Sequence, residues 1–456
     1  MKKYWAFFIL AVFAYLIRFY FLGFGIYGDG NGYYVISHTI LFEKKLNFDP
    51  ILKNFANFKA KKHTFNRIFW KTDKTKTGVK NIPWLIGTSL FWLPSLAIIS
   101  LVNIIFELNL AHFSVLYELG PGITGIILGL AGLYFLERYL NNFFKRKTIL
   151  LTIVGLLFGT NLIYYIFFEP ALSHQISFFI VSYLLYKSYQ FKIGKPNIFI
   201  IGFLSGLLLI TRIPEIIFLI PIYFQIIKDN RKKFSWLWLF LFTFGFLIAQ
   251  GPQMIFQKFM YGSFFANPYF IGQKGSFNHF QLIGIYNHLF SASRGFFAWA
   301  PILLLGLIGA VGAISPTSPT AQLGVKAARE KNHKEFFLVF FAVFLFYTFL
   351  IAYWDPYVSA GFGDRFFIVS IPYLGLGLAY FIDKYWSKKT IFLIIILCLW
   401  NFLLLNQFFF NSRYLTGDKN LSFQRLVIEQ FNTPLKVIRL IKEKGYNNTI
   451  YKYYIE

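Results

Sequence analysis

Several acidic and basic side chains lie where long apolar runs of this sequence begin or end. Asp29 lies among glycines in GIYGDGNGYYVISHTI, and Glu169 and His174 lie in FFEPALSHQISFF. A carboxylate or an imidazole at such a place can accept a proton, which makes these three residues candidates for acid–base catalysis. Two simpler interpretations stay open. In the first, Asp29 only forms a turn. In the second, Ser173 caps a helix and a neighbouring group forms a hydrogen bond with His174.

Cations occur in comparable positions. They lie in VKNIPWLIG, LLLITRIPEIIF, YNHLFSASRGFFAWAP and GFGDRFFIVSIP, and they are Lys80, Arg212, Arg294 and Arg365. Arginine binds a phosphate through two parallel hydrogen bonds, and neighbouring backbone N–H groups add donors. These positions therefore predict an anion-binding site.

Each cation also has an interpretation that involves no ligand. Arg212 pairs with Glu215, and Arg365 pairs with Asp364 or Asp355, which are all nearby in the sequence. An arginine at a membrane boundary can instead extend its charged end into water. In the corresponding interpretation of VKNIPWLIG, Lys80 is a solvated loop residue.

The elements that must position these residues are membrane helices. Hydrophobic residues make up 57% of the 456 residues and charged residues only 14%, whereas soluble domains are about 25% charged. Apolar runs of about 20 residues, the length that spans a bilayer as a helix, recur along the chain. The net charge of +26 fits basic cytoplasmic loops better than a nucleic-acid partner. We therefore predict an all-α polytopic membrane protein.

About eleven spans are expected. They cover residues 4–23, 116–137, 148–168, 174–188, 196–211, 214–228, 234–259, 297–314, 336–353, 366–383 and 390–410. Lysine and arginine concentrate in alternate connections, which places the N-terminus in the cytoplasm and the C-terminus outside. The run 84–106 is also long enough to span, but crossing would invert this order. We expect it to lie at the interface or to re-enter; the alternative is that it crosses and a weak span elsewhere does not.

This topology divides the chain into a transmembrane domain, residues 1–411, and an external C-terminal tail, residues 412–456. The domain contains a long external loop over 24–115, with interfacial helices that include 84–106, and a cytoplasmic linker over 315–335. All the candidate acids and cations then fall on the external face of the cytoplasmic (inner) membrane.

The order of the motifs resembles the GT-C superfamily of polyprenyl-phosphate-sugar-dependent glycosyltransferases. This superfamily includes protein O-mannosyltransferases and the aminoarabinose transferase of lipid A, and the chain is most similar to its uncharacterised bacterial members. The motifs that carry the resemblance are GDGNGYY, KNIPWLIGTSLFWLP, FGTNLIYYIFFEPALSH, GFLSGLLLITRIPE, LFSASRGFFAWAP and GFGDRFFIVSIP. Many relatives read Gly-Pro-Arg where this chain has Asp364 before Arg365. The resemblance implies a GT-C-like fold with a long first external loop.

The resemblance also implies an inverting transferase that moves a sugar from a polyprenyl-phosphate carrier to a lipid, glycan or protein acceptor. Asp29 would be the general base, with Glu169 as the second acidic residue of the family and His174 beside it. Arg365 and Arg294 would neutralise the departing phosphate, with Arg212 or Lys80 in reserve, and Tyr33 would contact substrate. No cofactor is certain and a divalent metal is left open. The alternatives are a transporter or lipid flippase, and a structural membrane protein.

Overall fold

The computed structural model describes residues 2–43, 45–60, 63–190, 197–230, 235–266, 281–314, 327–354, 361–410 and 421–445. The described chain is helical apart from one two-stranded antiparallel hairpin. Its first half contains α1 (Lys2–Leu22), α2 (Asp29–Phe42), α3 (Asp49–Ala56), β1 (Phe58–Ala60), β2 (His63–Phe65), α4 (Gly87–Ile105), η1 (Val115–Glu118), α5 (Leu119–Leu140), α6 (Arg146–Gly159), α7 (Leu162–Phe167), α8 (His174–Gln190) and α9 (Ile198–Thr211). Its second half contains η3 (Ile213–Leu219), α10 (Ile220–Asn230), α11 (Trp236–Tyr261), α13 (Leu282–Phe290), α14 (Phe296–Trp299), α15 (Ile302–Ile314), α16 (Ala327–Trp354), η6 (Arg365–Ser370), α17 (Ile371–Lys384), α18 (Lys388–Phe410) and α20 (Phe423–Lys444).

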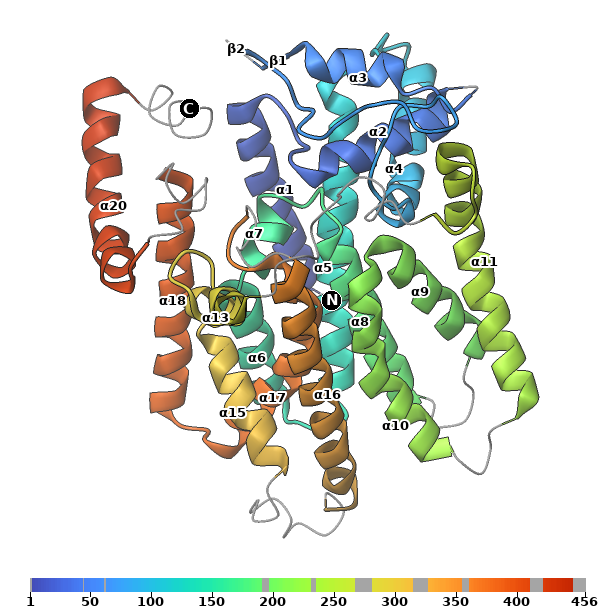
Figure 1. Cartoon of the computed structure of the whole chain (residues 1–456). Coiled ribbons are helices and arrows are strands. Elements are labelled where there is room, and N and C mark those ends of the chain that lie inside the picture. The colour runs from blue at the N-terminus through green and yellow to red at the C-terminus, as the bar shows by residue number, and fades with distance from the viewer. Residues whose placement is uncertain are drawn as a thin grey trace.

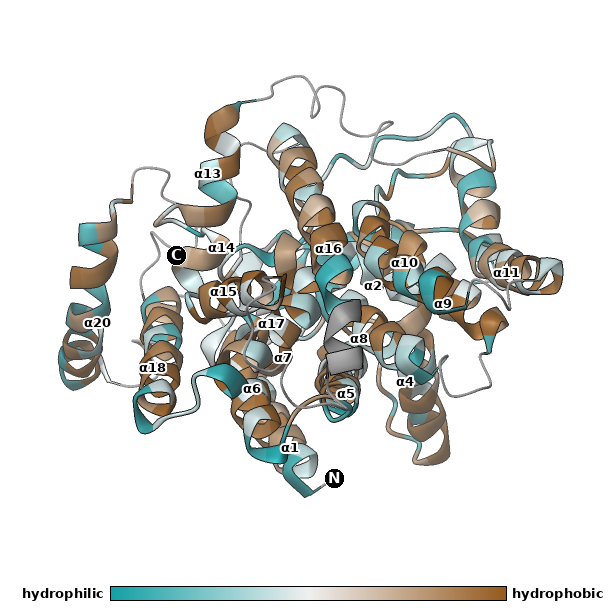
Figure 2. Cartoon of the chain, turned by 90° about the horizontal axis from the view of Figure 1, so that it is seen from below, coloured by the Kyte–Doolittle hydropathy of each residue, from teal (hydrophilic) through white to brown (hydrophobic). Residues whose placement is uncertain are grey.

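Within the described ranges, seven helical segments are long and apolar enough to cross a bilayer. They are Lys2–Leu22, Gly87–Ile105, Val115–Leu140, Trp236–Tyr261, His333–Trp354, Arg365–Lys384 and Lys388–Phe410. Many of their large apolar side chains are exposed, as a lipid-facing surface requires. Figure 2 shows hydrophobic residues along most of the bundle. The chain is therefore a polytopic membrane protein, while the expected count of about eleven spans stays a prediction.

Several expected spans are interrupted. The span expected at 148–168 is divided into α6 and α7 at Thr160 and Asn161, and the span expected at 297–314 is divided into α14 and α15. Side-chain amides satisfy backbone groups at or near these breaks, because Asn161 Nδ2 donates to Asp364 O (3.2 Å) and Asn401 Nδ2 donates to Trp299 O (2.9 Å). Irregular backbone at membrane depth is stable only with such partners.

Glycines allow the closest helix contacts in the bundle. A Cβ added to Gly202 or Gly206 of α9 would collide with the backbone of α11, and one added to Gly306 of α15 would collide with α17. Both helix pairs therefore approach closely because they present glycines there, as is common where helices meet in membranes.

A cap of residues 23–86, which contains α2, α3 and the hairpin, covers one end of the bundle, at the top of Figure 1. The helix α4 follows directly and packs against α2, α5 and α9. It matches the run at 84–106. Because it is long and apolar enough to span, its interfacial placement stays a prediction.

Candidate active site

Asp29 is the first residue of α2 and follows a sharp turn at the end of α1. Gly28 has φ +55°, which glycine adopts without strain. The other glycines of GDGNG lie inside the helix rather than in the turn. A Cβ on Gly30 would meet the carbonyl of Ala171, and one on Gly32 would meet the ring of Trp84. The turn thus places a carboxylate at a helix N-terminus, where the helix dipole favours negative charge.

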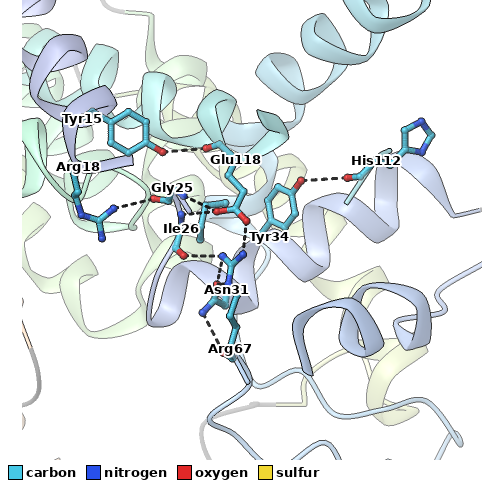
Figure 3. Close-up of polar contacts among 9 residues, drawn as sticks. All are labelled: Tyr15, Arg18, Gly25, Ile26, Asn31, Tyr34, Arg67, His112 and Glu118. Carbon is cyan, nitrogen blue, oxygen red and sulfur yellow. Dashed lines mark hydrogen bonds and ion pairs between the residues drawn. The ribbon is translucent and has the colours of Figure 1, made fainter. Parts of the chain in front are cut away.

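A buried ion pair holds the chain on both sides of Asp29 (Figure 3). Arg67 contacts Glu118, whose Oε2 accepts the N–H groups of Gly25 and Ile26, both at 2.8 Å. Arg67 Nη2 donates to Ile26 O (2.7 Å) and to Asn31 Oδ1 (2.6 Å). The turn between α1 and α2 is therefore bonded to two distant segments of the chain.

Aromatic rings surround the Arg67 guanidinium. Its Cζ lies 4.1 Å from the centroid of Phe55, 4.7 Å from Phe58 and 5.6 Å from Phe24. With Arg67 4% exposed and Glu118 1% exposed, this pair is closed to substrate and holds the structure together. Neither residue stands out in the sequence, because no local pattern shows that the two meet.

Asp29 contacts Arg365, the cation of GFGDRFFIVSIP. Arg365 Nη2 lies 2.8 Å from Asp29 Oδ2, and the two side chains are 16% and 24% exposed. Of the two alternative partners expected from the sequence, Asp364 pairs elsewhere, and Asp355 lies outside the described residues. The first candidate base and a candidate phosphate ligand therefore meet at a place that solvent reaches.

The partner of Asp364 is His288, a residue of α13. His288 Nδ1 lies 2.5 Å from Asp364 Oδ2, and both side chains are fully buried. Asp364 Oδ1 accepts the N–H of Phe366 (3.0 Å) and so begins η6, which places Arg365. His288 lies close to Arg294 in the sequence, within YNHLFSASRG, and that proximity is its only sequence signal.

Arg212, in LLLITRIPEIIF, contacts a residue of FFEPALSHQISFF. It forms an ion pair with Glu215 (2.5 Å), as one alternative expected, and its Nη1 also donates to Ser173 Oγ (3.2 Å). The hydroxyl of Tyr33 is bonded to the same Ser173 oxygen at 3.3 Å. A polar chain from Tyr33 to Arg212 therefore links α2 to the loop before η3.

Arg294 is buried, with 1% of its surface exposed. Burial, partly offset by Tyr165, lowers the pKa of Arg294 to about 10, and the nearby Arg365 cation adds to this decrease. Arg365 in turn interacts electrostatically with Arg212 and with the buried Glu169. Buried cations within range of one another create a site that favours an additional anion.

His174 lies next to these cations without a hydrogen bond to any described residue. Its side chain is 1% exposed and both ring nitrogens lack a partner. It interacts electrostatically with Arg212 and Arg365. The expectation that a neighbour satisfies His174 is therefore wrong for the described chain. Buried polar atoms that lack partners are costly, so they mark a place that a polar ligand can fill.

Lys80 lies apart from this group. Its Nζ pairs with Asp49 Oδ1 at 2.8 Å, and both side chains are well exposed. The structure thus brings Asp29, Arg365, Arg294 and Arg212 into one electrostatic cluster, called here the arginine cluster, but Lys80 pairs elsewhere. In the part of the chain that the structure describes, no group of three or more His, Cys, Asp or Glu residues is arranged to hold a metal ion.

Comparison of the chain with known protein families, with curated proteins and with solved structures finds no match. The geometry of the arginine cluster and its neighbours is therefore the basis on which a function is argued.

Proposed function

We propose that the protein is a membrane glycosyltransferase that moves a sugar from a polyprenyl-phosphate carrier to an acceptor hydroxyl on the external face of the membrane. The proposal includes a GT-C-like arrangement of about eleven spans in the cytoplasmic membrane, with the N-terminus inside and the C-terminus outside. The acceptor is a lipid, a glycan or a protein.

The 2.8 Å contact between Asp29 and Arg365 is the observation that carries this proposal. In such a reaction the base and the phosphate ligand belong to one small site but act on opposite faces of the anomeric carbon, because the acceptor attacks from the side away from the departing phosphate. In this proposal a donor phosphate binds Arg365 in place of the Asp29 carboxylate. Donor binding would displace the carboxylate and leave it available to the acceptor.

In the proposed reaction the acceptor oxygen bonds to the anomeric carbon while the bond from that carbon to the phosphate oxygen breaks. Asp29 takes the acceptor proton, a contribution of about 10² to 10⁴ in rate. The charge that develops on the phosphate is stabilised by Arg365 and Arg294, with Arg212 nearby. Fixed charges of this kind in a site of low dielectric constant often provide the largest single effect in catalysis.

The experiment uses purified protein in lipid nanodiscs, with undecaprenyl phosphate as the carrier and its monosaccharide phosphodiesters as donors. We expect Asp29→Asn to abolish transfer and to retain carrier binding, because the amide keeps the size of the side chain but accepts no proton. Asp49→Asn is the matched control, since Asp49 lies in the same external segment and pairs with Lys80.

Substantial transfer by the Asp29→Asn protein would reject Asp29 as the base. If the wild-type protein instead moves undecaprenyl phosphate across the bilayer and transfers no sugar, the lipid flippase alternative replaces the transferase.

A further inference from the structure

The helix α20 has one buried face and one exposed apolar face. The buried face packs against α18 and consists of Leu426, Gln430, Thr433 and Val437. These residues recur every three or four positions and so form one stripe along the helix. The contact is fixed by a hydrogen bond from Gln407 Nε2 of α18 to Leu426 O, at 3.3 Å.

The exposed apolar face points away from the described chain. We call it the outer stripe of α20; its residues are Val427, Ile428, Phe431, Leu435 and Ile438. Phe431 is 63% exposed and Leu435 is 67% exposed. A helix in water does not keep such large apolar side chains exposed along three turns without a partner that covers them.

The remaining face of α20 is basic. Its cations, Arg425, Lys436 and Arg439, outnumber Glu429 and Glu443 among the residues described there, and Lys442 follows the outer stripe one turn beyond Ile438. Only Lys436 forms an ion pair within the described helix, with Glu429 at 2.8 Å. An apolar stripe beside a basic face is the arrangement of helices that lie on the surface of anionic bilayers.

The neighbouring helix also points to lipid as the partner. The outward side chains of α18, among them Ile395, Leu399 and Phe402, are exposed and apolar, as in a helix that contacts the bilayer. Because α20 packs against α18, the outer stripe belongs to a helix next to one that is long and apolar enough to span a bilayer. Figure 1 shows α20 beside the upper part of α18.

We propose that α20 is an interfacial helix whose outer stripe inserts into the bilayer and whose basic face binds the headgroups of anionic lipids. The insertion depth typical of such helices is about 5 to 10 Å into the boundary between headgroups and acyl chains. This inference does not depend on the proposed transferase, because it uses no residue of the arginine cluster. It assigns the C-terminal tail a role in membrane attachment.

The test uses site-directed spin labelling of the full-length protein. Cys398 is the only cysteine, so Cys398→Ser gives a background free of thiols. Labels are then attached to Phe431→Cys and Leu435→Cys on the outer stripe and, as matched controls, to Asn432→Cys and Lys436→Cys on the neighbouring basic face, about 100° around the helix. Electron paramagnetic resonance measures collisions of each label with oxygen, which enters the bilayer, and with a water-soluble nickel chelate.

In nanodiscs that contain phosphatidylcholine and phosphatidylglycerol in equal parts, we expect the oxygen-to-nickel ratio to be severalfold higher at 431 and 435 than at 432 and 436. The ratio at 431 and 435 should fall in phosphatidylcholine alone, and also after the combined substitution of Lys436, Arg439 and Lys442 by Gln. Equal ratios at all four positions would reject insertion. Dipolar broadening between labels on separate copies would instead identify a second copy as the partner and overturn the proposal.

Discussion

His288 and Asp364 form a fully buried pair in which Nδ1 lies 2.5 Å from Oδ2. This contact engages the carboxylate that is adjacent to Arg365 in the sequence, and Arg365 itself contacts Asp29 instead. The arrangement of the arginine cluster therefore depends on these two pairings, His288 with Asp364 and Arg365 with Asp29.

The His288–Asp364 pair can be tested by removing one partner. His288→Gln leaves the Asp364 carboxylate buried without its imidazole, and removal of one partner of a buried pair costs about 3 to 5 kcal/mol. Adding Asp364→Asn should restore much of the stability, because the buried charge is then absent. Thermal unfolding in detergent measures both effects.

Substitution of Arg365 separates its charge from its geometry. Arg365→Lys keeps a cation beside Asp29 but loses the planar pair of donors, and Arg365→Ala loses both. We expect binding of undecaprenyl phosphate to weaken in Arg365→Lys and to weaken further in Arg365→Ala, as measured by isothermal titration. Normal binding by Arg365→Ala would take this residue out of the ligand site. Lys80→Ala is the control, because Lys80 pairs with the exposed Asp49.

The ion pair between Arg67 and Glu118 should be essential to the cap. Arg67→Ala leaves a carboxylate buried and removes the donor to Ile26 O and Asn31 Oδ1, so we expect a loss of about 3 to 5 kcal/mol. Hydrogen exchange of the amides at 25–31 should accelerate, because these residues lose their anchors. An unchanged exchange rate there would show that other contacts hold the Asp29 turn.

Stability should decrease in mild acid because of His38, which is 1% exposed in α2. Burial lowers the pKa of His38 from 6.5 to about 4, with a smaller contribution from His112. The unfolded state therefore binds a proton between pH 6.5 and 4 that the folded state does not bind, so stability falls as pH falls through this interval. The loss is about 3 kcal/mol, at about 1.4 kcal/mol for each pKa unit. His38→Phe should lose this part of the pH dependence, measured by unfolding between pH 7.5 and 4.

The position of α4 relative to the bilayer can be read from reporter fusions. If α4 does not cross, a reporter at Lys71 and one after Asn420 should report the outside, whereas reporters after Lys147 and Lys233 should report the cytoplasm. A cytoplasmic signal at Lys71 would mean that α4 crosses, and would place Asp29 away from an external site.

The sequence by itself determined the class of fold and the places where polar chemistry interrupts it. Apolar segments are recognisable along the chain because bilayer thickness sets their length, and this local rule identified the ranges of α1, α11 and α18. The same rule could not reveal the break between α6 and α7, because two polar residues, Thr160 and Asn161, do not by themselves end an apolar helix. It also identified Asp29 and Arg365 separately, since each is a charge at the end of an apolar run.

Only the tertiary structure decided which charges meet. Arg365 follows Asp364 in the sequence yet contacts Asp29. Glu118 and Arg67 are far apart in the sequence, yet their buried side chains form an ion pair. A carboxylate can accept from any cation that the packed helices bring within about 4 Å, and sequence order does not specify that distance. His288 was missed for the same reason, because a single histidine in an apolar segment acquires a role only when folding places a carboxylate 2.5 Å away.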